Sequence, residues 1–394
     1  MTNSKNMPKR RFPYFEGEWE QKEFGKMCQR IQTGTTLLGC EQGKGIPLLK
    51  MGNIQRGYWD FTKLERLNQE IECENIIKYG DFLFNTRNTL ELVGKGATWF
   101  IKEGLYGFNS NLARATLDDV DTIFFNYLYN IPGSIQQVKS RAVGTTSVAA
   151  IYPKDMSTIK FQLPTINEQN KLGYFFQTID SLISLHQHKL DKLKNLKKAY
   201  LAELFPAEGK RLPKRRFPGF EGGWEEKKLG EVVEKFDNLR IPVASKDRIA
   251  GNVPYYGANG IQDYVEGFTH DGEFVLLAED GANDLNDYPV QYVNGKVWVN
   301  NHAHVIQGRI NLIDNKFLLF AIKQIQMEPY LVGGGRAKLN AEIMMNLPLT
   351  APDIEEQRMI GVFLMKVEKQ ISLQQQKLDK LNDLKKAYLN ELFV

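Results

Sequence analysis

The sequence predicts an α+β protein with two mixed, β-rich modules, joined by two long helices that form an antiparallel coiled coil. Three observations predict this class. A leading motif occurs twice, a charged helical segment occurs twice, and the stretches between them combine frequent glycine with short apolar runs. Because duplicated halves commonly pack like the subunits of a twofold dimer, we expect a tandem repeat with a pseudo-twofold axis.

The leading motif opens each half of the chain. It reads KRRFPYFEGEWEQKEFGKM at Lys9–Met27 and KRRFPGFEGGWEEKKLGEV at Lys214–Val232, with 12 of 19 positions identical. The stretches that follow the two motifs share no segment of alignable sequence. The repeated motif and helical segment therefore flank two unlike modules. We place the first module, with its leading motif, at residues 1–163, and the linker with the second module at residues 207–350.

Short patterns within the modules favour both strands and helices. Asp81–Asn85 and Glu273–Ala278 are short apolar runs, and Lys296–Ile306 alternates as a half-buried strand does. Asp118–Tyr129 and Asn315–Met327 favour helices instead. Each module is therefore predicted to be α+β.

Each half ends in a segment with helical periodicity, at residues 164–206 and 351–394. KLDKLKNLKKAYLAELF at Lys189–Phe205 and KLDKLNDLKKAYLNELF at Lys377–Phe393 are identical at 14 of 17 positions. Apolar residues recur at three- and four-residue steps, and a capping box precedes each segment. A helix of this length spans about 60 Å and usually packs on a partner helix. Mutual antiparallel pairing is favoured over two separate hairpins or domain caps.

Composition and charge exclude several classes of protein. No run of 18 apolar residues and no signal peptide is present, so we expect a cytoplasmic chain without a membrane partner. Three cysteines without paired spacing indicate reduced thiols instead of a disulfide framework or a zinc site. The excess of Lys and Arg over Asp and Glu, 51 − 47 = 4, permits nucleic-acid binding without requiring it.

Candidate DNA-binding residues are those that can hydrogen-bond base edges or phosphates from glycine-rich loops. In the first module they are Lys50, Asn53, Gln55, Arg56, Asn85, Arg87, Asn88, Lys95, Asn109 and Asn111. In the second module they are Tyr255, Tyr256, Asn259, Asn300, Asn301, His302, His304, Arg336 and Lys338.

Neither catalytic residues nor metal ligands are assigned. His302 and His304 alternate on a predicted strand as two ligands would, but no third ligand has a recognisable spacing, so a buried, hydrogen-bonded pair is favoured. A P-loop and the tripeptide with which amino-methyltransferases grip the target amine are both missing. We therefore predict a chain without catalysis of its own.

The repeated features together resemble the specificity subunit of type I restriction-modification enzymes. They are the RRFP-F-EG-W motif, the helices with KLDKL-x-x-LKKAYL-x-ELF, and the pairs Glu168-Gln169 and Glu356-Gln357 after a proline. The resemblance implies that each module is a target-recognition domain for one half of a bipartite, asymmetric site on double-stranded DNA. It also implies that the conserved helices set the spacer between the halves.

The resemblance further implies partners that hold the cofactors. Two methyltransferase subunits would dock on the helices and use S-adenosylmethionine to methylate adenine, and up to two restriction subunits would use ATP and Mg. This chain would bind no cofactor itself.

Two other functions stay open from the residues alone. A single-chain restriction enzyme or methyltransferase would transfer methyl groups without partners, and a non-catalytic coiled-coil scaffold would lack steeply salt-dependent binding to duplex DNA.

Overall fold

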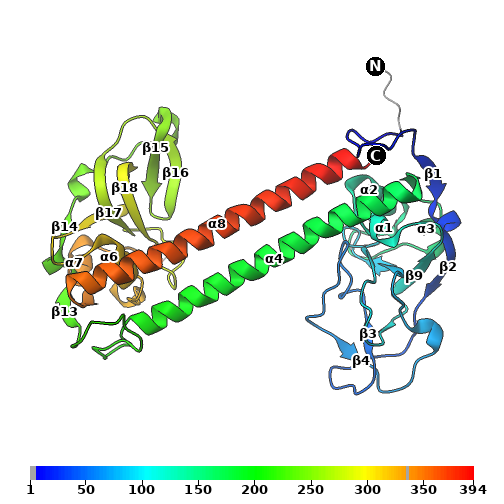
Figure 1. The fold of residues 1–394 in the computed structure, drawn as a ribbon, viewed down its shortest axis with the longest axis horizontal. Coiled ribbons are helices and arrows are strands. Elements are labelled where there is room, and N and C mark those ends of the chain that lie inside the picture. Colours follow the sequence, from blue (N-terminus) through cyan, green and yellow to red (C-terminus); the bar gives the residue numbers. More distant parts are fainter. Residues whose placement is uncertain (1–5, 334–336) are drawn as a thin grey trace. The chain divides into compact units, whose positions relative to one another are not determined.

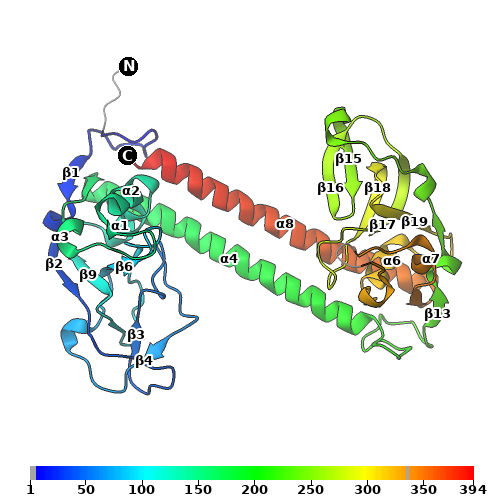
Figure 2. The same ribbon diagram turned by 180° about the vertical axis from the view of Figure 1, so that it is seen from behind.

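The computed structural model describes residues 6–333 and 337–394, which fall into two units. Unit 1 contains the residues up to Gln187 together with Lys377–Val394, and unit 2 contains His188–Gln376. Each unit therefore holds one module and a part of each long helix (Figures 1 and 2). No helix in the described ranges is long and apolar enough to cross a membrane.

The described residues of unit 1 form several small sheets and, besides the long helices, three short α-helices. Its largest sheet has the strand order β2-β9-β5-β7 and is antiparallel throughout. The strands of unit 1 are β1 Glu20–Glu23, β2 Cys28–Thr33, β3 Pro47–Leu49, β4 Glu65–Arg66, β5 Phe82–Asn85, β6 Arg87–Asn88, β7 Gly96–Thr98, β8 Gly107–Phe108, β9 Leu112–Leu117, β10 Val143–Gly144, β11 Ala149–Ala150 and β12 Lys160–Leu163. The helices are α1 Thr122–Tyr129, α2 Pro132–Arg141 and α3 Pro153–Met156.

The core of unit 1 is aromatic. Phe24 lies among Phe82, Phe125 and Phe161, with ring centroids 5.6–6.3 Å from its own. All four side chains are buried, so they join the main sheet, α1 and β12 in one hydrophobic cluster. Burial of this kind is the dominant favourable contribution to folding.

Unit 2 has one six-stranded sheet in the order β14-β19-β17-β18-β15-β16, in which only the β15–β18 pair is parallel. Its strands are β13 Glu225–Lys228, β14 Val233–Lys235, β15 Ala250–Gly257, β16 Gly260–Val265, β17 His270–Ala278, β18 Val290–Val299, β19 Ala303–Gly308 and β20 Pro348–Ala351. Its short helices are α5 Leu229–Val232, α6 Asn315–Ile322 and α7 Ala341–Met345.

The alternating stretch expected to form one strand over Lys296–Ile306 is divided between β18 and β19. Asn300 causes the break, because its Oδ1 accepts a hydrogen bond from the backbone N of His302 at 2.8 Å and stabilises a turn. The helix expected over Asn315–Met327 ends earlier, at Ile322.

The two long helices are α4, Ile166–Leu204, and α8, Ile354–Leu392, each of 39 residues. In unit 1 the rings of Phe175 on α4 and Tyr388 on α8 are 5.3 Å apart. In unit 2 the rings of Tyr200 on α4 and Phe363 on α8 are 4.8 Å apart. Early residues of one helix thus contact late residues of the other, which confirms the antiparallel pairing (Figures 1 and 2).

The repeated motif makes the same contacts in both units. Arg11 binds both carboxylate oxygens of Glu168 at 2.7 and 2.6 Å, and Arg216 does the same with Glu356 at 2.8 and 2.7 Å. These bidentate pairs attach each leading motif to the first turn of a long helix.

Two glycines in equivalent positions let the long helices approach the short ones. A Cβ on Gly173 of α4 would lie 2.9 Å from the backbone N of Phe124, and one on Gly361 of α8 would lie 2.7 Å from that of Phe317. Because no real Cβ makes so close a contact with backbone, only glycine fits where α4 meets the start of α1 and α8 meets the start of α6.

Candidate nucleic-acid interface

Four candidate residues of unit 1 lie together at the end of β5. Asn85 is fully buried, and its Oδ1 accepts from the backbone N of Lys95 at 3.1 Å while its Nδ2 donates to the carbonyl of Leu92, also at 3.1 Å. It therefore holds the loop between β5 and β7. Lys95 Nζ then donates to Gln55 Oε1 at 2.7 Å, which brings in the loop that carries Arg56.

The positive charges of Arg56 and Lys95 interact electrostatically with Glu91 and Asp60 respectively, but not at ion-pair distance. Neither side chain forms an ion pair with a carboxylate in the described part of the chain. Arg56 donates only to the backbone carbonyl of Glu91, at 3.1 Å, and its Nη1 is buried without a partner. Burial lowers the pKa of both groups, and for Lys95 the neighbouring charge of Arg56 acts in the same direction. Lys95 is only 8% exposed and Arg56 is half-buried, and two neighbouring, largely buried cations without a directly bonded carboxylate favour a negatively charged ligand such as a phosphate.

The other candidates of unit 1 differ in exposure. Arg87 is exposed on β6 and makes no hydrogen bond through its side chain among the described residues, so it is free to reach a ligand. Asn109 and Asn111 form the turn before β9, where the Asn109 side chain accepts from the backbone N of Asn111. Asn88 is half-buried and caps its own turn by accepting from the backbone N of Thr89.

Lys50 and Asn53 belong to the local structure of their loop. Lys50 is paired with Glu65. Asn53 is 5% exposed, and its Nδ2 donates to the carbonyls of Asp60 and Lys63 at 3.0 and 2.7 Å. Sequence alone did not distinguish these internal bonds from contacts with DNA.

In unit 2 the two candidate tyrosines lie within β15, and Asn259 and Asn300 stabilise turns. Tyr255 is 1% exposed and Tyr256 is half-buried. Asn259 links the β15–β16 turn to the loop after β17, because its Nδ2 donates to the carbonyl of Gly281 at 2.9 Å. Asn300 is buried in the turn already described, whereas the neighbouring Asn301 is exposed and makes no side-chain hydrogen bond among the described residues.

The histidines are hydrogen-bonded to carboxylates. His302 Nδ1 lies 2.7 Å from Asp280 Oδ1. His304 is buried, with Nδ1 2.7 Å from Asp237 Oδ2 and Nε2 2.8 Å from the carbonyl oxygen of Leu339. The ring of His304 thus connects β19 to Asp237, which follows β14, and to Leu339, which precedes α7.

Asp237, Glu279 and His304 also have the spacing of a metal site, since their ligand atoms lie within 4.8 Å of one another. Two cations already occupy this cluster. Arg240 Nη1 is 2.6 Å and Lys338 Nζ 2.7 Å from the carboxylate of Glu279. The arrangement is therefore an internal ion-pair network, and Lys338 belongs to it. Arg336 lies outside the described residues.

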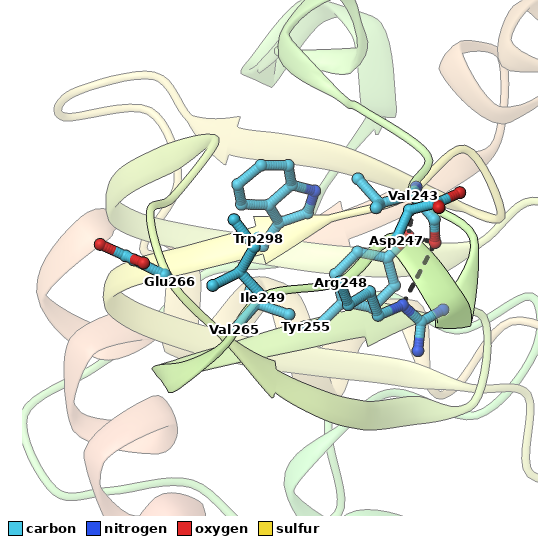
Figure 3. Close-up of a pocket in the computed structure, with 8 residues that line it drawn as sticks. All are labelled: Val243, Asp247, Arg248, Ile249, Tyr255, Val265, Glu266 and Trp298. Atoms are coloured by element: carbon cyan, nitrogen blue, oxygen red, sulfur yellow. Dashed lines mark hydrogen bonds between the residues drawn. The ribbon is translucent and has the colours of Figure 1, made fainter.

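Sequence reasoning missed an aromatic pocket in unit 2. Tyr255, Trp298 and Arg248 line a cavity of about 140 Å³ (Figure 3). Tyr255 was a candidate, but Trp298 was taken only as part of an alternating strand. The signal available was the position of an aromatic residue two places before the candidate Asn300.

Comparisons with known proteins agree on one family. The family model described as the type I restriction modification DNA specificity domain matches residues 16–195 and 221–383. A putative type I restriction enzyme specificity subunit from Haemophilus influenzae is 47% identical over 139 residues, which is 35% of each chain. The putative MjaX specificity subunit from Methanocaldococcus jannaschii is 23% identical over 404 residues, covering 95% of this chain and 92% of the relative.

The fold also has a match among solved structures. The crystal structure of a type I restriction-modification S subunit from M. genitalium superposes with a TM-score of 0.72 at 15% identity, covering 98% of this chain and 99% of that one. At this level of identity the likeness shows a common fold.

Proposed function

Because this chain belongs to the family of type I restriction modification DNA specificity domains, we propose that it selects the DNA site of a restriction-modification complex whose partner subunits carry out the chemistry. The observation that carries this function is the double match: one family segment covers each module. A non-catalytic specificity subunit also accounts for the absence of a catalytic motif from the sequence.

Each module reads one half of a bipartite, asymmetric site. The repeated residues form the leading motifs and the long helices, whereas the modules differ in strand number, sheet order and loops. Two unlike surfaces read two unlike sequences. Sequencing the methylated motif in cells that express this chain with its methyltransferase tests this directly, and replacing residues 212–349 with another such module should change one block only. A change in both blocks would contradict the modular assignment.

Within unit 1 the cluster of Gln55, Arg56 and Lys95 contacts phosphates. Lys95→Ala should weaken binding to all duplexes alike and reduce the slope of log K against log salt by about 1. Arg87→Ala is the comparison: an exposed side chain that reads a base should cost about 1–3 kcal/mol at one position of one block. Asn301→Ala should do the same in the other block.

The partners carry the cofactors. Methylating a base within a duplex requires a pocket that receives the extruded base. This pocket and the bound S-adenosylmethionine are part of the methyltransferase subunits, which act on adenine. Restriction subunits, up to two, would add ATP- and Mg-dependent cleavage. The chain's own contribution is to place these partners on the DNA.

The helices offer a surface on which two copies of one partner dock. Leu196 on α4 and Leu384 on α8 occupy equivalent positions of the repeat and are 41% and 39% exposed. Lys192 lies one turn before Leu196 on the same face, and Lys380 is its counterpart before Leu384. Packing within the units does not require leucine at an exposed position, so its occurrence in both copies favours two identical partner contacts.

Single substitutions test this docking surface. Leu196→Asp and Leu384→Asp should each remove one methyltransferase subunit from the complex, and the double variant should remove both, as measured by sedimentation. Leu182→Asp is the matched control, because Leu182 is 40% exposed on α4 but its counterpart in the repeat is Gln370. If Leu196→Asp, Leu384→Asp and the double variant all retain two subunits, the partner docks elsewhere.

A further inference from the structure

The aromatic pocket of unit 2 is assembled from three strands and the segment before β15. Trp298 from β18 provides an aromatic wall, and the buried ring of Tyr255 from β15 carries the guanidinium of Arg248 over it. Val265 closes the end at β16, and Val243 and Ile249 come from the preceding segment. Figure 3 shows these side chains around a common space, with Glu266 extending away from it.

The two rings are held in place by hydrogen bonds at their edges. Trp298 Nε1 donates to the carbonyl of Ile241 at 2.8 Å, and the hydroxyl of Tyr255 accepts from the backbone N of Val243 at 2.9 Å. The rings lie 27° from parallel with centroids 6.4 Å apart. The pocket is therefore formed before any ligand arrives, so little ordering is needed on binding.

The rim combines an exposed apolar residue with a cation. Ile249 is 68% exposed at the mouth. Arg248 lies 4.1 Å from the centroid of the Tyr255 ring, with Nε 3.2 Å from the carbonyl oxygen of Val243 and Nη1 3.4 Å from Asp263. These bonds fix the guanidinium and leave Nη2 without a partner among the described residues.

We propose that this pocket binds one unstacked pyrimidine base of the bound DNA. A cavity of about 150 Å³ with apolar walls accommodates a single six-membered ring, and this pocket has about 140 Å³. Base stacking on an aromatic side chain is a general mode of binding to unpaired nucleotides, and Trp298 provides the face. Val243, Ile249 and Val265 suit the C5 methyl group of thymine, while Arg248 Nη2 suits a carbonyl oxygen or the adjoining phosphate.

The inference rests on the proposed function and deepens it. When a methyltransferase extrudes the target base from the duplex, the base opposite loses its pairing and stacking partner. For a target adenine this orphaned base is a thymine. A pocket of single-ring size on the specificity chain stabilises that base outside the stack and so favours the extruded state.

The test uses the complex with its methyltransferase partner and duplexes that contain its methylated site. In each duplex one purine is replaced by an abasic residue, so that the pyrimidine opposite is already unpaired. We expect one such duplex to bind about tenfold or more tightly than the intact site, because the cost of unpairing is removed.

Substitutions in and near the pocket connect this gain to it. Ile249→Trp fills the mouth from an exposed position without removing buried atoms, and it should abolish the gain. Ile261→Trp is the matched control, since Ile261 is 48% exposed on β16 and does not line the pocket. Trp298→Phe should retain most of the gain, because a stacking ring is kept.

Three results would overturn the inference. One is an undiminished gain in Ile249→Trp, and another is an equal loss in the Ile261→Trp control. A third is weaker association of Ile249→Trp with the methyltransferase subunit in the absence of DNA, which would make the pocket a protein-docking site. If the wild-type complex selects no split site at all, the proposed function fails, and this inference fails with it.

Discussion

The pair of Arg216 and Glu356 should be the main connection between the second leading motif and α8. The Glu356 side chain is fully buried, and Arg216 contributes two charged hydrogen bonds to it and a third to the carbonyl of Gly222 at 2.6 Å. Arg216→Met keeps most of the aliphatic packing but leaves the carboxylate of Glu356 buried without its partner.

The expected cost follows from this burial. Removing one partner of a buried ion pair typically costs about 3–5 kcal/mol, because the remaining charge is left uncompensated. Replacing both partners by apolar groups is often close to neutral. Arg216→Met should therefore lower the free energy of unfolding of unit 2 by about 3–5 kcal/mol, and Arg216→Met/Glu356→Met should recover most of that loss.

Hydrogen exchange at stepped denaturant concentrations measures the two units separately, which matters because a chain with two units does not unfold as one two-state system. Peptides from the second leading motif and the start of α8 should lose protection in Arg216→Met, while unit 1 stays unchanged. Arg11→Met should produce the mirror result through Glu168. A loss below about 1 kcal/mol, or a double variant as unstable as the single one, would refute the reasoning.

Three further outcomes are expected. Inserting one heptad after Gln187 in α4 and after Gln376 in α8 adds about 10 Å of helix, so the unread spacer in the methylated motif should lengthen by about three base pairs with both blocks unchanged. Burial raises the pKa of the Cys28 thiol to about 12, so a thiol reagent at about pH 8 should label the two exposed cysteines at once and Cys28 only on unfolding. Burial opposes ionisation of Asp237, but the hydrogen bonds from His304 and a backbone N–H outweigh it and hold the pKa of Asp237 below its usual value. This carboxylate stabilises unit 2 at neutral pH and loses that contribution below about pH 4, so denaturant titrations of Asp237→Asn should show a weaker fall in stability with acid.

The paired helices and their antiparallel arrangement were predictable because the two copies of the repeat make the same contacts and therefore keep the same residues. Arg11 and Arg216 each hold a buried glutamate in the first turn of a long helix, and Trp19 and Trp224 are buried in equivalent positions. The identity, spacing and helical period of these repeated residues therefore predicted the leading motifs and the long helices.

The candidate site was predicted only as a set of residue types. Asn53, Asn85 and Asn300 have the hydrogen-bonding groups that read bases, yet all three use those groups in hydrogen bonds within the protein. Arg87 and Asn301, chosen by the same rule, are exposed and make no side-chain hydrogen bond among the described residues. Local sequence does not distinguish the two cases, because the partner of each amide is set by segments distant along the chain.

The sequence by itself determined the tandem repeat, the length of its helices and the family to which the chain is similar, because these depend on period and identity along the chain. Only the tertiary structure decided which polar groups are available and where aromatic rings leave a space. Arg56 and Lys95 come together through the loops around β5, and the pocket of Tyr255 and Trp298 requires the parallel pairing of β15 with β18. The physical reason is that burial and hydrogen-bond satisfaction are properties of all the neighbours of a group, and most of those neighbours are remote in sequence.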